Sequence, residues 1–106
     1  MSTEKGIKLD DNKDRWDLLP LELIEQVIKV LTFGANKYTD NGWQSVPNGY
    51  NRYRGALLRH LVAAEKGILH DEETGLYHLA HMATNALFML HFKLKEDNEL
   101  RNVDSN

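Results

Sequence analysis

The chain has 106 residues, of which 42% are hydrophobic and 27% are charged, as is usual for a single soluble globular domain. Its formal net charge of −3 gives no general attraction to nucleic acid or anionic membranes, and it contains no cysteine for a disulfide or a thiolate metal site. With no apolar run long enough to span a bilayer and no signal peptide, we expect a cytoplasmic protein without nucleic-acid or membrane partners.

The N-terminal residues 1–17 are charged and show no periodicity, which predicts an arm outside the folded domain. Lys13 and Arg15 lie beside Trp16, so the arm could close over a ligand or clamp onto a neighbouring molecule. We expect a helical domain over 18–96 and a flexible tail over 97–106.

The first helical block, over 18–38, has Pro20 in its first turn, where no backbone donor is missed. Its apolar residues form two adjacent stripes, the first Leu23, Val27 and Val30, the second Ile24, Ile28, Leu31 and Ala35. Together they cover more than the roughly 100° face of an ordinary surface helix. This width predicts contacts on two sides and a homo-oligomer, most simply a dimer.

Residues 39–49 are rich in Gly, Asn, Asp and Pro, which predicts a loop. Lys37, Tyr38 and Trp43 flank or lie in this loop, where an aromatic ring could stack on a base and the lysine could reach a phosphate. The simpler alternative is an aromatic side chain folded over the core beside a solvated lysine.

The second helix is predicted over 50–66, and Gly67 is a suitable stop. Arg52 and Arg59 are seven residues apart and project in the same direction, whereas Arg54 lies on another side. Guanidinium groups match phosphate oxygens in a bidentate way, although a solvated basic face would show the same spacing.

The third helix, predicted over 74–96, carries two offset stripes. The residues of one are apolar and are expected to pack the core: Leu76, Ala80, Ala83, Leu87, Leu90 and Leu94. The other contains His78, His81, Asn85, Phe88 and Phe92. Buried imidazole and amide groups are costly without partners. Together with His60 on the second helix, these groups are either ordinary core residues with local partners or the walls of a polar pocket.

The acidic residues nearest these histidines are Glu65, Asp71, Glu72 and Glu73. Carboxylates could hold a hard cation such as Mg²⁺. Alternatively, Asp71 caps a helix and the others are surface charges. Because no strand-like alternation appears, the predicted fold is all-α: a small bundle of three main helices near 20–38, 50–66 and 74–95, completed by oligomerisation.

Four segments, in this order and with these gaps, resemble the N-terminal domain of the phage dATP/dGTP diphosphohydrolase family, which is described as related to MazG-like pyrophosphohydrolases. The segments are "DDNKDRWDLLP", "VLTFGANKYTDNGWQ", "ALLRHL" and "DEETGLYHLAHMATNALFML". The resemblance covers about residues 8–92 and implies an all-α nucleotide-binding unit, phage-encoded and acting in the host cytoplasm on purine deoxynucleoside triphosphates. The polar residues at matching positions are Lys13, Arg15, Lys37, Tyr38, Trp43, Arg59, His60, Asp71, Glu73, His78, His81 and Asn85.

The chain departs from MazG-like enzymes in the residues expected to hold the metal. Those enzymes carry EExxE on one helix and ExxD on the next, whereas this chain has His78-x-x-His81 where ExxD would lie. Imidazoles are poor ligands for Mg²⁺ and better ligands for Mn²⁺, Zn²⁺ or Fe²⁺. The metal could therefore differ, the acids before the third helix could supply it, or the protein could bind nucleotide without turnover.

Three functions follow as alternatives. In the first, a divalent metal (Mg²⁺ or Mn²⁺) activates water for pyrophosphate release from a purine dNTP. The expected catalytic residues are Arg59, His60, Asp71 and Glu73; the nucleotide-binding residues Lys13, Arg15, Lys37, Tyr38, Trp43, Arg52 and Asn85; and the metal ligands Asp71, His78 and His81. In the second, the same pocket sequesters a nucleotide immune signal without catalysis. In the third, the chain is a structural oligomer.

Overall fold

The computed structural model describes residues 12–105, with side chains described as far as Asn102; the greater part of the predicted arm lies outside this range. Its α-helices are α2 (Leu21–Lys37), α3 (Gly49–Glu65) and α4 (His78–Ser105), with two 3₁₀ turns, η1 (Trp16–Leu18) and η2 (Gly42–Ser45). Between residues 12 and 105, extended backbone pairs only at an isolated bridge between His70 and Tyr77. The all-α prediction is confirmed.

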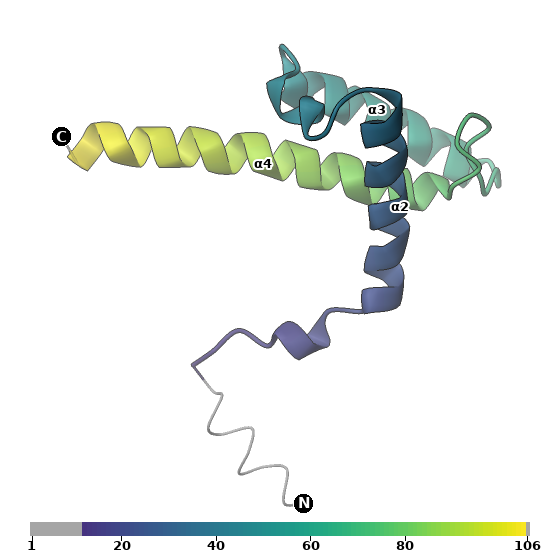
Figure 1. Ribbon diagram of the computed structural model, residues 1–106, viewed down its shortest axis with the longest axis horizontal. Helices are drawn as coiled ribbons and strands as arrows, with labels where there is room; N and C mark the ends of the chain where they lie inside the picture. Colours follow the sequence, from purple (N-terminus) through teal and green to yellow (C-terminus); the bar gives the residue numbers. More distant parts are fainter. Residues whose placement is uncertain (1–11, 106) are drawn as a thin grey trace, which may run out of the picture.

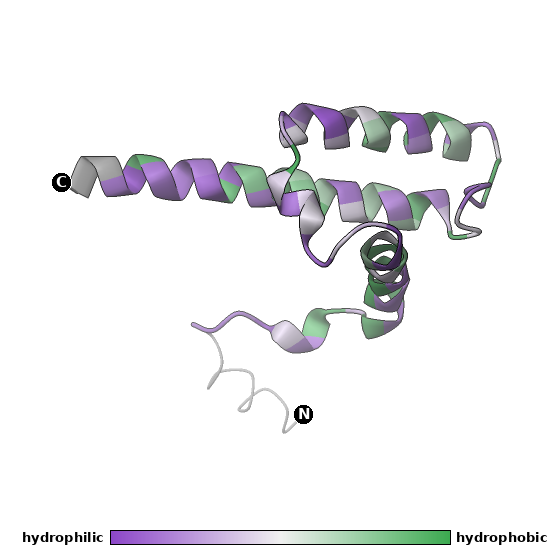
Figure 2. Ribbon diagram, turned by 45° about the horizontal axis from the view of Figure 1, so that its top comes forward, coloured by the Kyte–Doolittle hydropathy of each residue, from purple (hydrophilic) through white to green (hydrophobic). Residues whose placement is uncertain are grey.

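Helices α3 and α4 lie side by side as an antiparallel hairpin, and α2 crosses α4 near the end of α4 that is close to the α3–α4 connection (Figure 1). The C-terminal part of α4 continues well past the end of α3 and, coloured by hydropathy, is mostly hydrophilic (Figure 2). None of the helices within residues 12–105 combines the length and apolarity needed to cross a membrane.

Helix α4 begins at His78, four residues later than the sequence periodicity predicted. The preceding residues form a tight turn in which one Asp71 carboxylate oxygen accepts hydrogen bonds from the Thr74 amide (2.9 Å) and hydroxyl (3.1 Å). Gly75 then has φ +74°, a left-handed conformation that cannot continue a right-handed helix. Because this turn satisfies its polar groups locally, it replaces the predicted first turn of the helix.

Helix α4 also continues past residue 96, where the sequence periodicity predicted its end, as far as Ser105. One ion pair at helical spacing lies within this extension, Asp97–Arg101 (3.1 Å), and another lies just before it, Lys93–Glu96 (3.5 Å). Such pairs contribute about 0.2–0.5 kcal/mol each to a solvated helix.

The interior is formed by the polar and aromatic stripe of α4. His78, Thr84 and Asn85 are buried, together with Ala80 and, from α2, Val27. The prediction that the leucine stripe packs the core is wrong for its C-terminal members, since Leu87, Leu90 and Leu94 are 48%, 52% and 53% exposed. Periodicity identifies two apolar sides of a helix but does not determine which side meets the other helices of the same chain.

An aromatic cluster attaches η2 to the helix hairpin. Trp43 stacks on Phe88 with ring centroids 4.1 Å apart, and Tyr53 meets the same Phe88 ring edge-on at 4.8 Å. The Tyr53 hydroxyl donates a hydrogen bond to the Trp43 carbonyl at 3.1 Å. These contacts fix the loop between α2 and α3 against the middle of α4.

Gly49 at the start of α3 is buried against the ring of Phe92, and a Cβ atom there would clash with that ring. We expect Gly49→Ala to lower the free energy of unfolding by about 1–3 kcal/mol, the usual cost of overpacking. Gly55→Ala is the control: its Cβ would make only an ordinary contact with Arg59, so gaining a helix-forming residue should stabilise by about 0.5–1 kcal/mol. Urea unfolding of both variants measures the difference, and equal effects would contradict the contact with Phe92.

Candidate functional site

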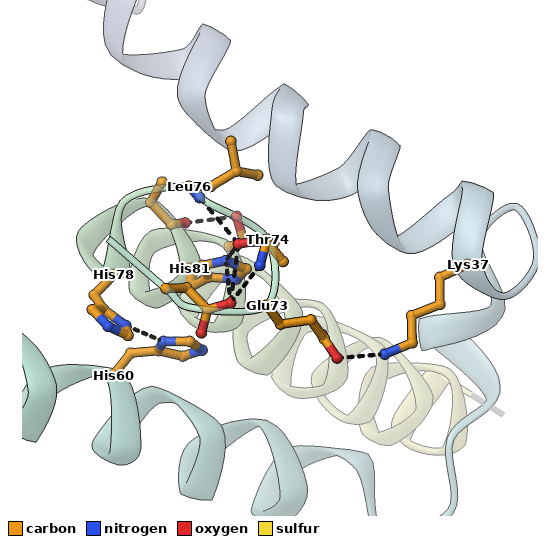
Figure 3. A network of polar contacts seen from close by, with 10 residues as sticks. Lys37, His60, Glu73, Thr74, Leu76, His78 and His81 are labelled. Atoms are coloured by element: carbon orange, nitrogen blue, oxygen red, sulfur yellow. Dashed lines mark hydrogen bonds and ion pairs between the residues drawn. The ribbon is translucent and has the colours of Figure 1, made fainter. Parts of the chain in front are cut away.

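Two histidines and an aspartate converge where α3, the α3–α4 connection and α4 meet. His60 is on α3, Asp71 is in the connection, and His78 is the first residue of α4; one ligand atom from each lies within 4.8 Å of the others. The Nδ1 atoms of His60 and His78 are 2.8 Å apart (Figure 3). We call His60, Asp71 and His78 the His–Asp cluster.

The cluster depends on the way the connection folds back onto itself. Gly67, with φ +84°, ends α3, and the chain then pairs briefly with itself: the His78 amide donates to the Leu69 carbonyl (3.0 Å) and the Asp71 amide to the Leu76 carbonyl (2.7 Å). This pairing places Asp71 beside the first turn of α4. Two of the three cluster residues therefore come from one short local fold.

The environment of the cluster favours the carboxylate form of Asp71 and the neutral form of His60. Burial lowers the pKa of His60, and the nearby His81 lowers it further. Burial alone would raise the pKa of Asp71, but the hydrogen bonds from the Thr74 amide and hydroxyl outweigh it, so this pKa is lowered. The short contact between Nδ1 of His60 and Nδ1 of His78 also requires that only one of these nitrogens carries a proton.

His81 lies next to the cluster but makes different contacts. Its ring is parallel to that of His60, with centroids 4.5 Å apart, and its Nε2 atom is 2.8 Å from the Thr74 hydroxyl. The nearest Asp71 oxygen is 4.0 Å from Nε2. Burial lowers the pKa of His81 despite this carboxylate. The sequence prediction named Asp71, His78 and His81 as metal ligands. Among the described residues, the group whose ligand atoms lie close enough to share a metal ion contains His60 in place of His81.

A cavity of about 1020 Å³ opens beside the cluster, between α2, the η2 loop, α3 and α4. Most of the site residues predicted from sequence line it: Lys37, Tyr38, Trp43, Arg52, Arg59, His60, Glu73, His81 and Asn85. Arg54 is not part of the lining, as its position on another side of the helix predicted. Ligand sites in proteins occupy about 300–1,000 Å³, so the space is sufficient for a nucleotide.

The cavity has two chemically different ends. His60 and His81 line the end beside the His–Asp cluster, whereas Trp43, Tyr53 and Phe88 line the other end. Tyr53 and His60 are seven residues apart on α3, which corresponds to about 10 Å along a helix. A ligand that spans the cavity would therefore meet imidazoles at one end and aromatic rings at the other.

Asn85 lies between these two ends and is only 8% exposed. Its side chain lines the cavity, and none of the side-chain hydrogen bonds found among residues 12–102 involves it. An amide offers both donors and an acceptor. Its position leaves these groups available to a bound molecule.

An ion pair between Lys37 and Glu73 crosses the cavity margin from the end of α2 to the α3–α4 connection, with Nζ 2.9 Å from the carboxylate (Figure 3). The hydrogen bond to Glu73 raises the pKa of Lys37, which keeps the ammonium group charged. Glu73 therefore neutralises a lysine of the cavity wall.

Four predicted residues lie apart from the cavity lining: Asp71 and His78 belong to the His–Asp cluster beside it, and the other two precede η1. Lys13 and Arg15 are exposed in the segment before η1, and Arg15 forms an ion pair with Asp17 at 2.7 Å.

The sequence reasoning also missed Thr74, which contacts both Asp71 and His81. The spacing Asp-x-x-Thr before a glycine, typical of a side-chain-capped turn, was the signal that could have found it.

The buried histidines predict a dependence of stability on pH. Because burial lowers the pKa values of His60 and His81 below the ordinary value of 6.5, the unfolded chain binds more protons near that pH than the folded chain does. The free energy of unfolding should therefore be greatest above about pH 6.5 and fall as the pH is lowered through it. Urea unfolding at pH 7.5 and 5.5, in the presence of a chelator, tests this. His60→Gln should keep only part of the difference in unfolding free energy between the two pH values. The control variant His70→Gln, which changes an exposed histidine, should keep all of it.

The fold and the site define a helical domain in which a His–Asp cluster adjoins a cavity lined by arginine, lysine and aromatic side chains. The sequence model of the family described as "dATP/dGTP diphosphohydrolase, N-terminal" matches residues 3–102, and the chain belongs to this family. It is 38% identical over 84 residues, 79% of its length, to a dATP/dGTP diphosphohydrolase of Salmonella phage PMBT28. The aligned part is only 28% of that curated relative. No solved structure matches the chain.

Proposed function

We propose that this chain is the nucleotide-binding unit of an enzyme that hydrolyses purine deoxynucleoside triphosphates to monophosphate and pyrophosphate with a divalent metal. The observation that carries the proposal is the cavity itself, whose lining combines Arg52, Arg59 and Lys37 with aromatic rings and with His60 of the adjoining His–Asp cluster. The family description and the name of the phage relative, a dATP/dGTP diphosphohydrolase, agree with this substrate class.

The His–Asp cluster is the proposed metal centre. Two imidazole nitrogens and one carboxylate suit Mn²⁺, Fe²⁺ or Zn²⁺ better than Mg²⁺, which prefers oxygen ligands. The short His60–His78 contact fits this role, since both Nδ1 atoms can turn their lone pairs to one cation when neither is protonated. When bound, such a metal supplies charge stabilisation on phosphate oxygens and lowers the pKa of a bound water.

The protein groups around the cluster have complementary tasks. Arg59 and Arg52 bind phosphate oxygens and stabilise the charge that develops as water attacks phosphorus and the bond to the departing pyrophosphate breaks. His81, neutral at pH 7 because burial lowers its pKa, accepts the proton released by the water. The base lies toward Trp43, and the Asn85 amide contacts the substrate between its base and its phosphates.

The test is a panel of dNTPs and cyclic dinucleotides incubated with the purified protein and Mn²⁺ or Mg²⁺, with products separated by chromatography and binding measured by calorimetry. Release of pyrophosphate from dATP and dGTP with Mn²⁺ is the expected result. Tight binding without products would instead support the non-catalytic alternative, in which the cavity sequesters a nucleotide signal. Absence of binding by every ligand would overturn both.

Arg59 and Arg54 form a matched pair for this test, because both are exposed arginines on α3 but only Arg59 lines the cavity. We expect Arg59→Ala to weaken dATP binding about tenfold, or about 1.4 kcal/mol for one lost charge-assisted contact. Arg54→Ala should leave the affinity within a factor of two. Equal losses in the two variants would indicate nonspecific attraction to positive charge.

A further inference from the structure

The hydroxyl group of Thr74 joins Asp71 of the His–Asp cluster to His81. Its Oγ1 atom lies 3.1 Å from a carboxylate oxygen of Asp71, 2.8 Å from Nε2 of His81 and 3.1 Å from the amide nitrogen of Leu76 (Figure 3). The carboxylate oxygen and Nε2 are 4.0 Å apart, which is too far for a hydrogen bond between them. The aspartate and the histidine are therefore connected through this hydroxyl.

The three partners of the hydroxyl determine where the protons lie. A hydroxyl has one proton to donate and two lone pairs that accept. The Leu76 amide can only donate, so it occupies one lone pair. Asp71, whose pKa is lowered, is a carboxylate that can only accept, so it receives the hydroxyl proton. The second lone pair of Oγ1 therefore faces Nε2 of His81, and this nitrogen must carry a proton.

The turn around Thr74 holds the hydroxyl in this position. The Thr74 amide donates to the same Asp71 oxygen at 2.9 Å, and the Gly75 amide donates to the Asp71 carbonyl at 2.8 Å. The backbone is thus fixed on both sides of the Thr74 Cα atom. A hydroxyl held in this way selects one of the two neutral forms of the imidazole that it contacts.

The other ring nitrogen of His81 is left with its lone pair. Nδ1 takes part in none of the side-chain hydrogen bonds found among residues 12–102, and no enclosed side-chain nitrogen or oxygen in this range lacks a partner. Nδ1 is therefore accessible, and the His81 side chain lines the cavity. A neutral imidazole that is protonated at Nε2 can accept a proton only at Nδ1.

We propose that Thr74 is a positioning residue that fixes His81 as the Nε2-protonated tautomer, so that Nδ1 is the atom that accepts a proton from the attacking water. This inference rests on the function proposed above and names the atom that takes the proton. As the water oxygen bonds to phosphorus, the bond from phosphorus to the departing pyrophosphate oxygen breaks. One water proton passes to Nδ1, and the other stays on the new phosphate oxygen. The imidazolium keeps its Nε2–H on Thr74, whose own proton remains directed at the Asp71 carboxylate.

The tautomer can be measured directly by two-dimensional ¹H–¹⁵N NMR of the native chain labelled with ¹⁵N-histidine. The sample contains a chelator and is kept at about pH 7.5, above the ordinary histidine pKa of about 6.5. Comparison with the spectrum of His81→Gln assigns the His81 signals. A protonated Nε2 and an unprotonated Nδ1 are the expected result. A protonated Nδ1, or a mixture of the two tautomers, would overturn the proposal without any change at Thr74.

Substitutions at Thr74 test whether its hydroxyl selects the tautomer. Thr74→Val keeps the shape of the side chain but loses the hydroxyl, so both neutral forms of His81 should appear, whereas Thr74→Ser should retain the native form. Thr84→Val is the matched control, because the Thr84 hydroxyl donates to the Ala80 carbonyl at 2.8 Å and not to His81. Its spectrum should show the native tautomer. A native tautomer in Thr74→Val would contradict the proposal; if circular dichroism shows that this variant is unfolded, the native and Thr74→Ser spectra decide.

Kinetics with dATP at saturating Mn²⁺ separate this inference from the proposed function. Thr74→Val should lower kcat about 10- to 100-fold and change KM by less than about threefold, and Thr74→Ser should recover most of the native kcat. An unchanged kcat in Thr74→Val overturns the inference and leaves the proposed function in place. If the native chain hydrolyses no dNTP, the proposed function fails together with the role of Nδ1, whereas the NMR spectra still decide whether Thr74 fixes the tautomer.

Discussion

Replacing Asp71 by Asn should remove metal-dependent activity and lower the affinity for Mn²⁺ at least about 100-fold. Asp71 supplies the only carboxylate of the His–Asp cluster, and changes to residues that merely orient metal ligands already reduce metal affinity by about 10- to 100-fold. The asparagine oxygen can still accept the Thr74 hydrogen bonds, so the turn before α4 should remain folded. Calorimetry with MnCl₂ and circular dichroism of the same sample separate loss of metal from loss of fold.

Glu72→Gln is the control for this experiment, because Glu72 is the exposed acid next in sequence and is not part of the cluster. Its Mn²⁺ affinity should stay within a factor of three of the natural chain. If Asp71→Asn behaves in the same way, the His–Asp cluster is not a metal centre, and the imidazoles serve packing and hydrogen bonding within the fold.

The largest loss of stability is expected from Phe88→Ala. Phe88 stacks on Trp43 and meets Tyr53 edge-on, so the substitution removes the contact that attaches η2 to α4. Large-to-small changes of a buried aromatic residue cost about 3–5 kcal/mol, and the partial exposure of Phe88 places the expected loss near the lower limit, about 3 kcal/mol. Urea unfolding monitored by tryptophan fluorescence and by circular dichroism measures the loss.

Leu100→Ala provides the comparison on the same helix, since Leu100 is largely exposed and should change the free energy of unfolding by no more than about 0.5 kcal/mol. A loss for Phe88→Ala as small as this would show that the loop carrying Trp43 is not held by the aromatic cluster.

Sequence reasoning located α2 and α3 well because their signals are local. Pro20 immediately precedes α2, and Gly67 follows α3 in the left-handed conformation that its type permits. The start of α4 was placed too early because Asp71, Thr74 and Gly75 form a turn whose side-chain hydrogen bonds do not appear in hydrophobic periodicity. A pattern of apolar residues does not report the side-chain hydrogen bonds that favour a turn over the first turn of a helix.

The candidate site was partly predictable for a similar reason. Polar residues one turn apart on an apolar helix indicated that His78, His81 and Asn85 share a side, and the structure places all three toward the interior. Which imidazole meets Asp71 depends on the crossing of α3 and α4, a tertiary feature that helical spacing does not specify. For the same reason the leucine stripe could not be assigned to the inside or the outside of the molecule.

The separation of His60 and His78 along the chain has a consequence for folding. These residues are 18 positions apart, yet their Nδ1 atoms are neighbours in space. A cation bound by both would act as a cross-link that closes this segment and restricts the conformations of the unfolded chain, as a disulfide of similar span does by about 3 kcal/mol in the chain-entropy description. This cysteine-free protein would thus have a reversible cross-link, and its free energy of unfolding would rise with the free concentration of the metal.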